Sequence, residues 1–96
     1  MPIRIDSGKG NWIEFRDSKW TFGTRMAILG APSDLEALDL VLGFVVGWNV
    51  TDIDGVAAPF DKGSSALLNV DDEVARWIIR AWFEAREERN RVPKVS

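Results

Sequence analysis

The side chains with the clearest potential for chemistry are the carboxylates of a short acidic turn. Asp52, Asp54 and Asp61 surround Gly55, a pattern that invites comparison with the calcium loop of EF-hands. When Gly55 is aligned with the invariant glycine of that loop, Asp52 and Asp54 fall on ligand positions and Asp61 falls on the last one. The first ligand position then falls on Val50, which has no side-chain oxygen, and Asp61 is shorter than the usual bidentate glutamate. The pattern therefore predicts a solvated acidic turn and no metal site.

No other group of residues points to catalysis. The sequence contains neither cysteine nor histidine, which removes thiolate chemistry, imidazole bases and the commonest zinc ligand. Asp71, Asp72 and Glu73 are consecutive, as expected at the start of a helix rather than in a pair of catalytic carboxylates. The sequence has no phosphate-binding loop, no dinucleotide glycine pattern and no nucleophile elbow. We expect a protein that is not an enzyme and has no cofactor.

Charge is distributed unevenly along the 96 residues. Residues 34–73 hold nine acids and one lysine, giving −8, whereas residues 1–33 carry +2 and residues 74–96 carry +3. An acidic centre disfavours binding to nucleic acid, which needs clustered lysine and arginine. Two explanations stay open for these acids: they lie at helix N-termini, where negative charge is favourable, or they form an acidic docking face.

The most apolar stretch of the chain is Leu40–Val46, which extends to Trp48 at most. A membrane-spanning helix needs about 20 apolar residues, so this stretch is too short. The N-terminal residues lack the apolar core of a signal peptide. We therefore expect a soluble protein that is not exported and does not enter the membrane.

The patterning along the chain predicts the elements that position these residues. Alternating residues around a Ser-Gly-Lys-Gly turn predict a β-hairpin, and Ser33 with Glu36 matches a capping box at the start of a helix. In chain order we expect the hairpin over about residues 3–16, a short helix from residue 20 or 24 to Leu29, an apolar helix from Ser33 to about Trp48, a two-residue turn at Asp54-Gly55, a last helix from about Asp71 to Asn90, and a frayed tail over residues 91–96. The fold class is α+β: a single domain over residues 1–96, mostly helical (about residues 20–90, about three helices) with a short N-terminal β-hairpin.

Apolar residues in excess of what the core needs predict a binding surface. The helix over residues 33–48 is apolar all round, and a chain this short has little material to cover every face of it. On the last helix, Ile79 and Phe83 fall beside the expected core stripe and either pack under the hairpin or face a partner. The predicted protein-binding residues, which also allow self-association, are Leu40, Val41, Phe44, Val46, Trp48, Ile79 and Phe83.

Two short motifs connect this architecture to a known family. Residues 12–17 read WIEFRD and residues 48–55 read WNVTDIDG, and a last helix carrying Trp77 and Ile78 follows them. Over residues 10–83 the chain resembles the tail assembly chaperones of long-tailed, siphovirus-like bacteriophages and their prophages. The resemblance implies an assembly factor of the bacterial host cytoplasm that binds the tape measure protein and helps recruit tail tube subunits. It brings no catalytic residue with it. Many members are made in two lengths by a translational frameshift, and this chain would be the short form.

Two other classes of protein also fit these residues. One is a small structural subunit of the virion, from the tail or the head–tail joint, which would remain in purified particles. The other is a binding module unrelated to phage, such as an antitoxin or immunity protein, which would form a tight stoichiometric complex with one toxin.

Overall fold

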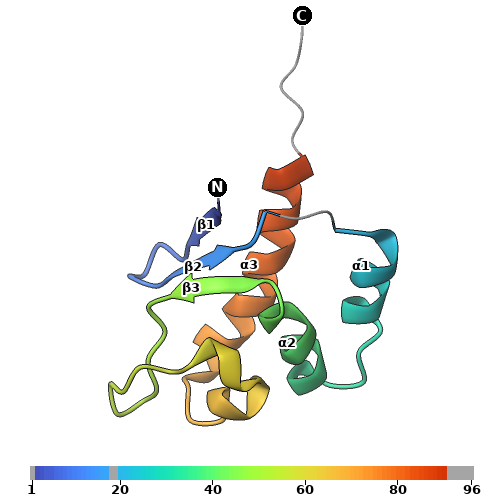
Figure 1. The fold of residues 1–96 in the computed structure, drawn as a ribbon. Coiled ribbons are helices and arrows are strands. Elements are labelled where there is room, and N and C mark those ends of the chain that lie inside the picture. The colour runs from blue at the N-terminus through green and yellow to red at the C-terminus, as the bar shows by residue number, and fades with distance from the viewer. Residues whose placement is uncertain (1, 18–19, 91–96) are drawn as a thin grey trace, which may run out of the picture.

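The computed structural model describes residues 2–17 and 20–90, in which an antiparallel sheet packs against α-helices (Figure 1). The elements follow in the order β1 (Ile3–Asp6), β2 (Trp12–Phe15), α1 (Phe22–Leu29), α2 (Asp34–Leu42), β3 (Val45–Trp48), the 3-10 turns η1 (Phe60–Lys62) and η2 (Ser64–Leu67), and α3 (Asp72–Asn90). The expected α+β class, with three helices among the described residues, is confirmed. The predicted frayed tail over residues 91–96 lies outside the described residues.

The predicted N-terminal hairpin is confirmed as the antiparallel pair β1–β2, in which Ile3 lies opposite Phe15. Ser7 closes the turn between the strands, because its Oγ accepts a hydrogen bond from the N–H of Asn11 at 3.2 Å. Side chains alternate across a strand, so Ile13 and Phe15 of β2 point to the same face. Both are fully buried, and this face forms one wall of the core.

The prediction for residues 33–48 is wrong. The apolar helix expected to extend to Trp48 ends at Leu42, and Val45–Trp48 form strand β3 instead. A short apolar run does not distinguish a buried helix from a buried strand. Here Gly43 weakens the helix, and the β-branched residues at positions 45 and 46 favour extended backbone. Residues 33–48 therefore do not form one helix that is apolar on every side. Strand β3 instead extends the hairpin to a three-stranded sheet in the order β1-β2-β3.

Strand β3 is held against β2 by residues that are far apart in the sequence. Phe15 lies opposite Val45, and the N–H of Arg16 donates to the carbonyl of Phe44 at 2.7 Å just beyond the paired residues. The segment that contains α1 and α2 therefore leaves the sheet from β2 and returns to the strand beside it.

The first two helices each begin at a side-chain cap, of which the one at Ser33 is predicted from the sequence and the one at Thr21 is not. The Oγ of Ser33 accepts from the N–H of Glu36 at 3.2 Å, which is the first half of the expected capping box. The hydroxyl of Thr21 accepts from the N–H of Thr24 at 3.1 Å at the start of α1. Each cap satisfies a backbone donor that the first helical turn leaves without a partner.

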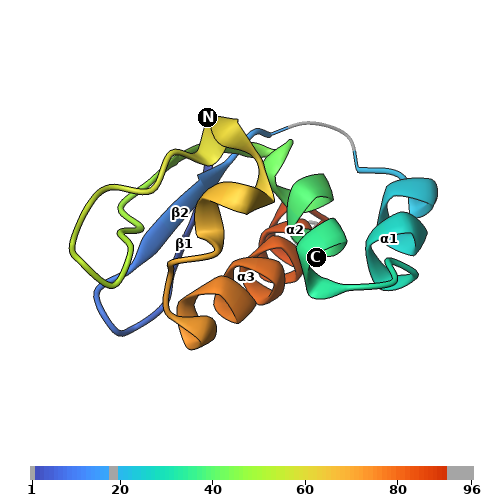
Figure 2. The ribbon, with the colours of Figure 1, turned by 90° about the horizontal axis from the view of Figure 1, so that it is seen from below.

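Helix α3 forms the centre of the core. Its residues Ile78, Ala81, Trp82 and Ala85 are fully buried, as the apolar stripe predicts. Helix α2 lies beside α3, and α1 lies on the outer side of α2 (Figure 2). Among the described residues, no helix combines the length and the apolar character needed to cross a membrane.

Candidate protein-binding surface

The fold does not bring the seven predicted binding residues onto one surface. Val41 is fully buried in the core, so its side chain cannot touch a partner in this fold. Leu40 and Val46 are exposed, but Leu40 belongs to α2 and Val46 to β3. Val46 therefore lies on the sheet, and not on the helix face from which its binding role was inferred.

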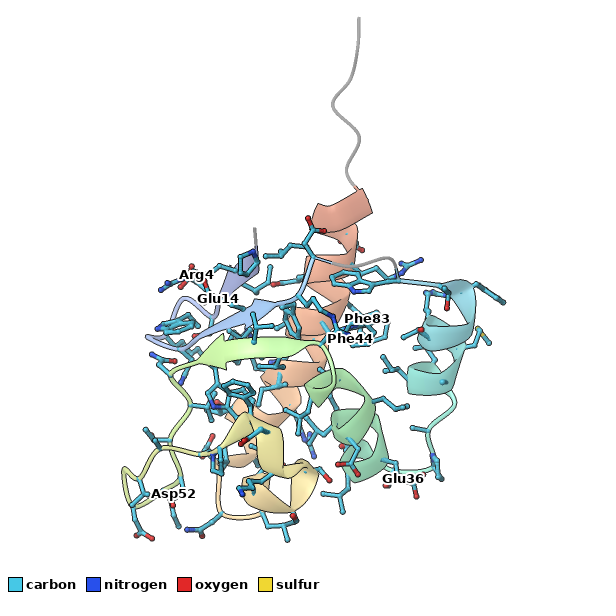
Figure 3. All side chains as sticks on the ribbon, in the orientation of Figure 1. Arg4, Glu14, Glu36, Phe44, Asp52 and Phe83 are labelled. Carbon is cyan, nitrogen blue, oxygen red and sulfur yellow. The ribbon has the colours of Figure 1, made fainter. Side chains whose placement is uncertain are left out.

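Phe44 and Phe83 belong to an aromatic cluster with Trp20 and Trp82 (Figure 3). The ring centroid of Phe44 lies 5.8 Å from those of both tryptophans, and the ring of Phe83 lies 5.0 Å from that of Trp82. Within the described part of the chain, the indole N–H groups of Trp20 and Trp82 are buried without a hydrogen-bond partner. The cluster joins α3 to the segments that flank α1 and α2, so both phenylalanines have a structural role.

The two motifs that carry the family resemblance meet at one end of the sheet. The N–H of Trp12 donates to Oδ1 of Asn49 at 2.9 Å, and Nδ2 of Asn49 donates to the carbonyl of Gly10 at 2.8 Å. The Nε1 of Trp48 donates to the carbonyl of Ala58 at 2.7 Å, across the acidic turn. The side chain of Trp48 therefore fixes the segment that follows the acidic turn. This hydrogen bond gives the tryptophan at the end of β3 a structural role.

The acidic turn is organised by hydrogen bonds within the protein. Oδ1 of Asp52 accepts from the N–H groups of Asp54 at 2.9 Å and Val56 at 3.0 Å (Figure 3). The N–H of Asp52 donates to the carbonyl of Val56 at 2.8 Å, so the loop contains the three residues 53–55 and not the predicted two. Gly55 has φ 83°, which suits the left-handed position of such a loop. No group of three or more acidic residues among those described is arranged to hold a metal ion.

A shallow apolar groove lies between the start of α2, the η2 turn and the first half of α3. It has a volume of about 290 Å³. Its lining residues are Asp34, Leu35, Leu38, Leu67, Leu68, Val70, Asp72, Ala75, Arg76 and Ile79. Of the residues predicted to bind a partner, Ile79 is the one that lines this groove.

The η2 wall of the groove is fixed by a hydrogen bond from α2. Oδ1 of Asp39 accepts from the N–H of Ser64 at 2.7 Å, and Ser64 is buried. The preceding Gly63 has φ 82°, and an added Cβ there would lie 3.4 Å from the same carboxylate oxygen. That distance is an ordinary contact, so it is the left-handed backbone of the turn that favours glycine at this position.

The rim of the groove is acidic. Asp34 begins α2 and Asp72 begins α3, so each carboxylate is at a helix N-terminus that stabilises it. Arg76 is the one base among the residues that line the groove, and its Nε lies 3.2 Å from Oδ2 of Asp72. Because this ion pair neutralises the arginine, Asp34 leaves the rim with net negative charge. Of the two explanations that the sequence left open, the helix N-terminus explanation holds for Asp34 and Asp72, and the acidic docking face stays a prediction.

Helix α1 carries a second exposed apolar surface, which we call the α1 stripe: Phe22, Met26 and Leu29. Their spacing of four and three residues puts them within about 60° of one another around the helix. They are 72%, 46% and 54% exposed, whereas Ile28, on another side of the helix, is buried. A row of exposed apolar residues on one helix face is typical of a surface that meets a partner.

Comparison with known proteins adds no relative: no family model, no curated protein and no solved structure matches this chain. The function is therefore argued from the two motifs and from the exposed apolar surfaces of the fold.

Sequence reasoning missed most of the exposed apolar surface. The spacing of Phe22, Met26 and Leu29 could have indicated the α1 stripe, because residues at i, i+4 and i+7 share one helix face. Leu68 had no such signal, since it follows a 3-10 turn whose packing depends on α2 and α3. The apolar run over residues 40–48 predicts a binding surface, but most of its residues belong to the core or to the sheet.

Proposed function

We propose that this chain is a tail assembly chaperone of long-tailed bacteriophages, which acts in the cytoplasm of the bacterial host. It binds the tape measure protein and helps to recruit tail tube subunits. The proposal starts from the resemblance of residues 12–17 and 48–55 to motifs of that family. The α1 stripe is the structural observation that carries it, because a chaperone for a long helical protein needs exposed apolar side chains that can cover apolar residues of its client.

The proposal also draws on how α1 is attached to the rest of the domain. This helix contributes Ile28 to the core, and its described contacts are mainly with α2. A helix at the margin of a domain can engage a client without disturbing the central packing of α3 against the sheet.

Co-expression of the chain with the tape measure protein encoded beside it tests this function. We expect a complex that keeps the tape measure protein in the soluble fraction, and we expect the chain to be missing from purified virions. Phe22→Asp should weaken the complex, because it places a charge in the centre of an apolar contact. Ile53→Asp is the matched control, since Ile53 is exposed to a similar degree on the acidic turn.

Other outcomes point to the two alternative classes. Recovery of the chain from purified particles would identify a structural subunit of the virion. A stoichiometric complex with a toxin, together with no affinity for the tape measure protein, would identify an antitoxin or immunity protein.

A further inference from the structure

We propose that the groove between α2, η2 and α3 is a docking site for a basic amphipathic helix. The inference rests on the proposed function in one respect, namely that the partner is helical. It goes further by naming the surface that the helix occupies and the charge that the helix must carry.

The shape and lining of the groove suit apolar side chains from a helix. Leu38, Leu67 and Val70 are buried and form its floor, while Leu35 and Leu68 are 42% and 73% exposed on its walls. A volume of about 290 Å³ is just below the range of roughly 300–1,000 Å³ typical of small-molecule pockets. An open apolar groove of this size matches the recognition of a helix through side chains spaced three and four residues apart.

The charge around the groove selects the partner. Asp34 and Asp72 lie on the rim. Arg76 pairs with Asp72 at 3.2 Å, so the lining residues carry one net negative charge, that of Asp34. Lysine or arginine residues beside the apolar face of the partner would complement this rim, whereas glutamate at the same places would be repelled.

The two ends of the groove are fixed by separate contacts, so its shape does not depend on a partner. The Ser33 cap holds the first turn of α2, and the bond from Ser64 to Asp39 holds η2 against the same helix. A preformed groove loses little conformational freedom on binding, which favours measurable affinity for a single helix.

Fluorescence anisotropy with two labelled synthetic peptides tests the proposal. Both peptides have about 20 residues, which is long enough to form a helix, and the same leucines at helical spacing. One carries lysine and the other glutamate beside the apolar face. We expect the lysine peptide to bind at least about tenfold more tightly at low salt, and this preference to shrink at about 1 M salt, where the Debye length falls to about 3 Å.

Two variants of the whole chain locate the site. Leu68→Asn should weaken binding of the lysine peptide by at least about tenfold, because it makes an apolar wall polar without adding a charge that would attract lysine. Val56→Asn should leave binding unchanged, since Val56 is 61% exposed but lies on the acidic turn and does not line the groove. Circular dichroism of each variant checks that the fold is retained.

Several results would overturn the proposal. Equal affinity for the two peptides would show that the rim does not select charge. Binding that survives Leu68→Asn but is lost in Phe22→Asn would place the peptide on α1. Concentration-dependent dimers that Leu68→Asn dissociates would show that a second copy of the chain covers the groove.

The outcome is separable from that of the proposed function. If the tape measure complex forms and Leu68→Asn has no effect on either peptide or complex, the chaperone function stands and the groove proposal fails. If the lysine peptide binds in the groove but no tape measure complex forms, the groove proposal stands and the chaperone function fails.

Discussion

The bond between Asp39 and Ser64 gives the sharpest test of how the groove is built. Asp39→Ala removes the acceptor that receives the N–H of Ser64 at 2.7 Å and leaves that donor buried without a partner. Loss of such a partner costs about 1–3 kcal/mol. Alanine has a higher helix propensity than aspartate, which returns up to about 0.7 kcal/mol on α2. We therefore expect a net loss of about 0.3–2.3 kcal/mol in the free energy of unfolding.

Urea denaturation followed by tryptophan fluorescence measures this loss, because the chain contains five tryptophans. In thermal unfolding the same loss corresponds to a fall of roughly 1–18 °C in Tm, at about 4–8 °C per kcal/mol for a domain of this size. Asp39→Asn is the matched control, since its Oδ1 can still accept the bond. The reasoning is refuted if the alanine and asparagine variants unfold at the same urea concentration.

Three further predictions concern the core, the acidic turn and the sheet. Trp82→Ala should destabilise the protein by about 3–5 kcal/mol, measured by urea denaturation, because it empties the centre of the aromatic cluster; a loss below about 1 kcal/mol would contradict the burial of Trp82. Gly55→Ala should cost about 1–2 kcal/mol in the same assay from its φ of 83° alone, since an added Cβ would meet no atom within 4 Å; an unchanged midpoint would mean that the turn has another conformation. Phe44→Asp should unfold the chain at a lower temperature than Val46→Asp in a thermal scan, because Phe44 packs in the aromatic cluster and Val46 is exposed; equal midpoints, or the reverse order, would refute this assignment.

Local signals in the sequence were sufficient for the elements that depend on local contacts. The apolar stripe of α3 and the cap at Ser33 both follow from spacing within one or two helical turns. The segment 45–48 required more, because it becomes a strand through its pairing with β2 about thirty residues earlier. Sequence spacing alone could not reveal that pairing, and the apolar run was therefore assigned to a helix.

The groove was still less accessible to sequence reasoning. Its walls come from α2, η2 and α3, and a single hydrogen bond from Asp39 sets the position of η2. Ile79 could be singled out because it falls beside the core stripe, but its neighbours Leu35 and Leu68 become neighbours only after the chain has folded. The excess of aspartate in the sequence does show that the region is acidic. The pairing of Asp72 with Arg76 follows from their spacing of four residues along α3.

The bond between Arg16 and Phe44 also has a consequence for how the sequence can vary. It brings together the two ends of the segment that holds α1 and α2, so this segment starts and finishes at one place on the sheet. Insertions and exchanges are tolerated best where the ends of a segment are close together and its backbone lies at the surface. Residues 20–32 can then diverge between related chains, provided that Ile28 and the ring of Trp20 keep their places, while the strands retain their register. A chimaera with a different amphipathic helix in place of α1 should keep its urea midpoint and change its partner, and loss of the cooperative transition would show that α1 is not separable in this way.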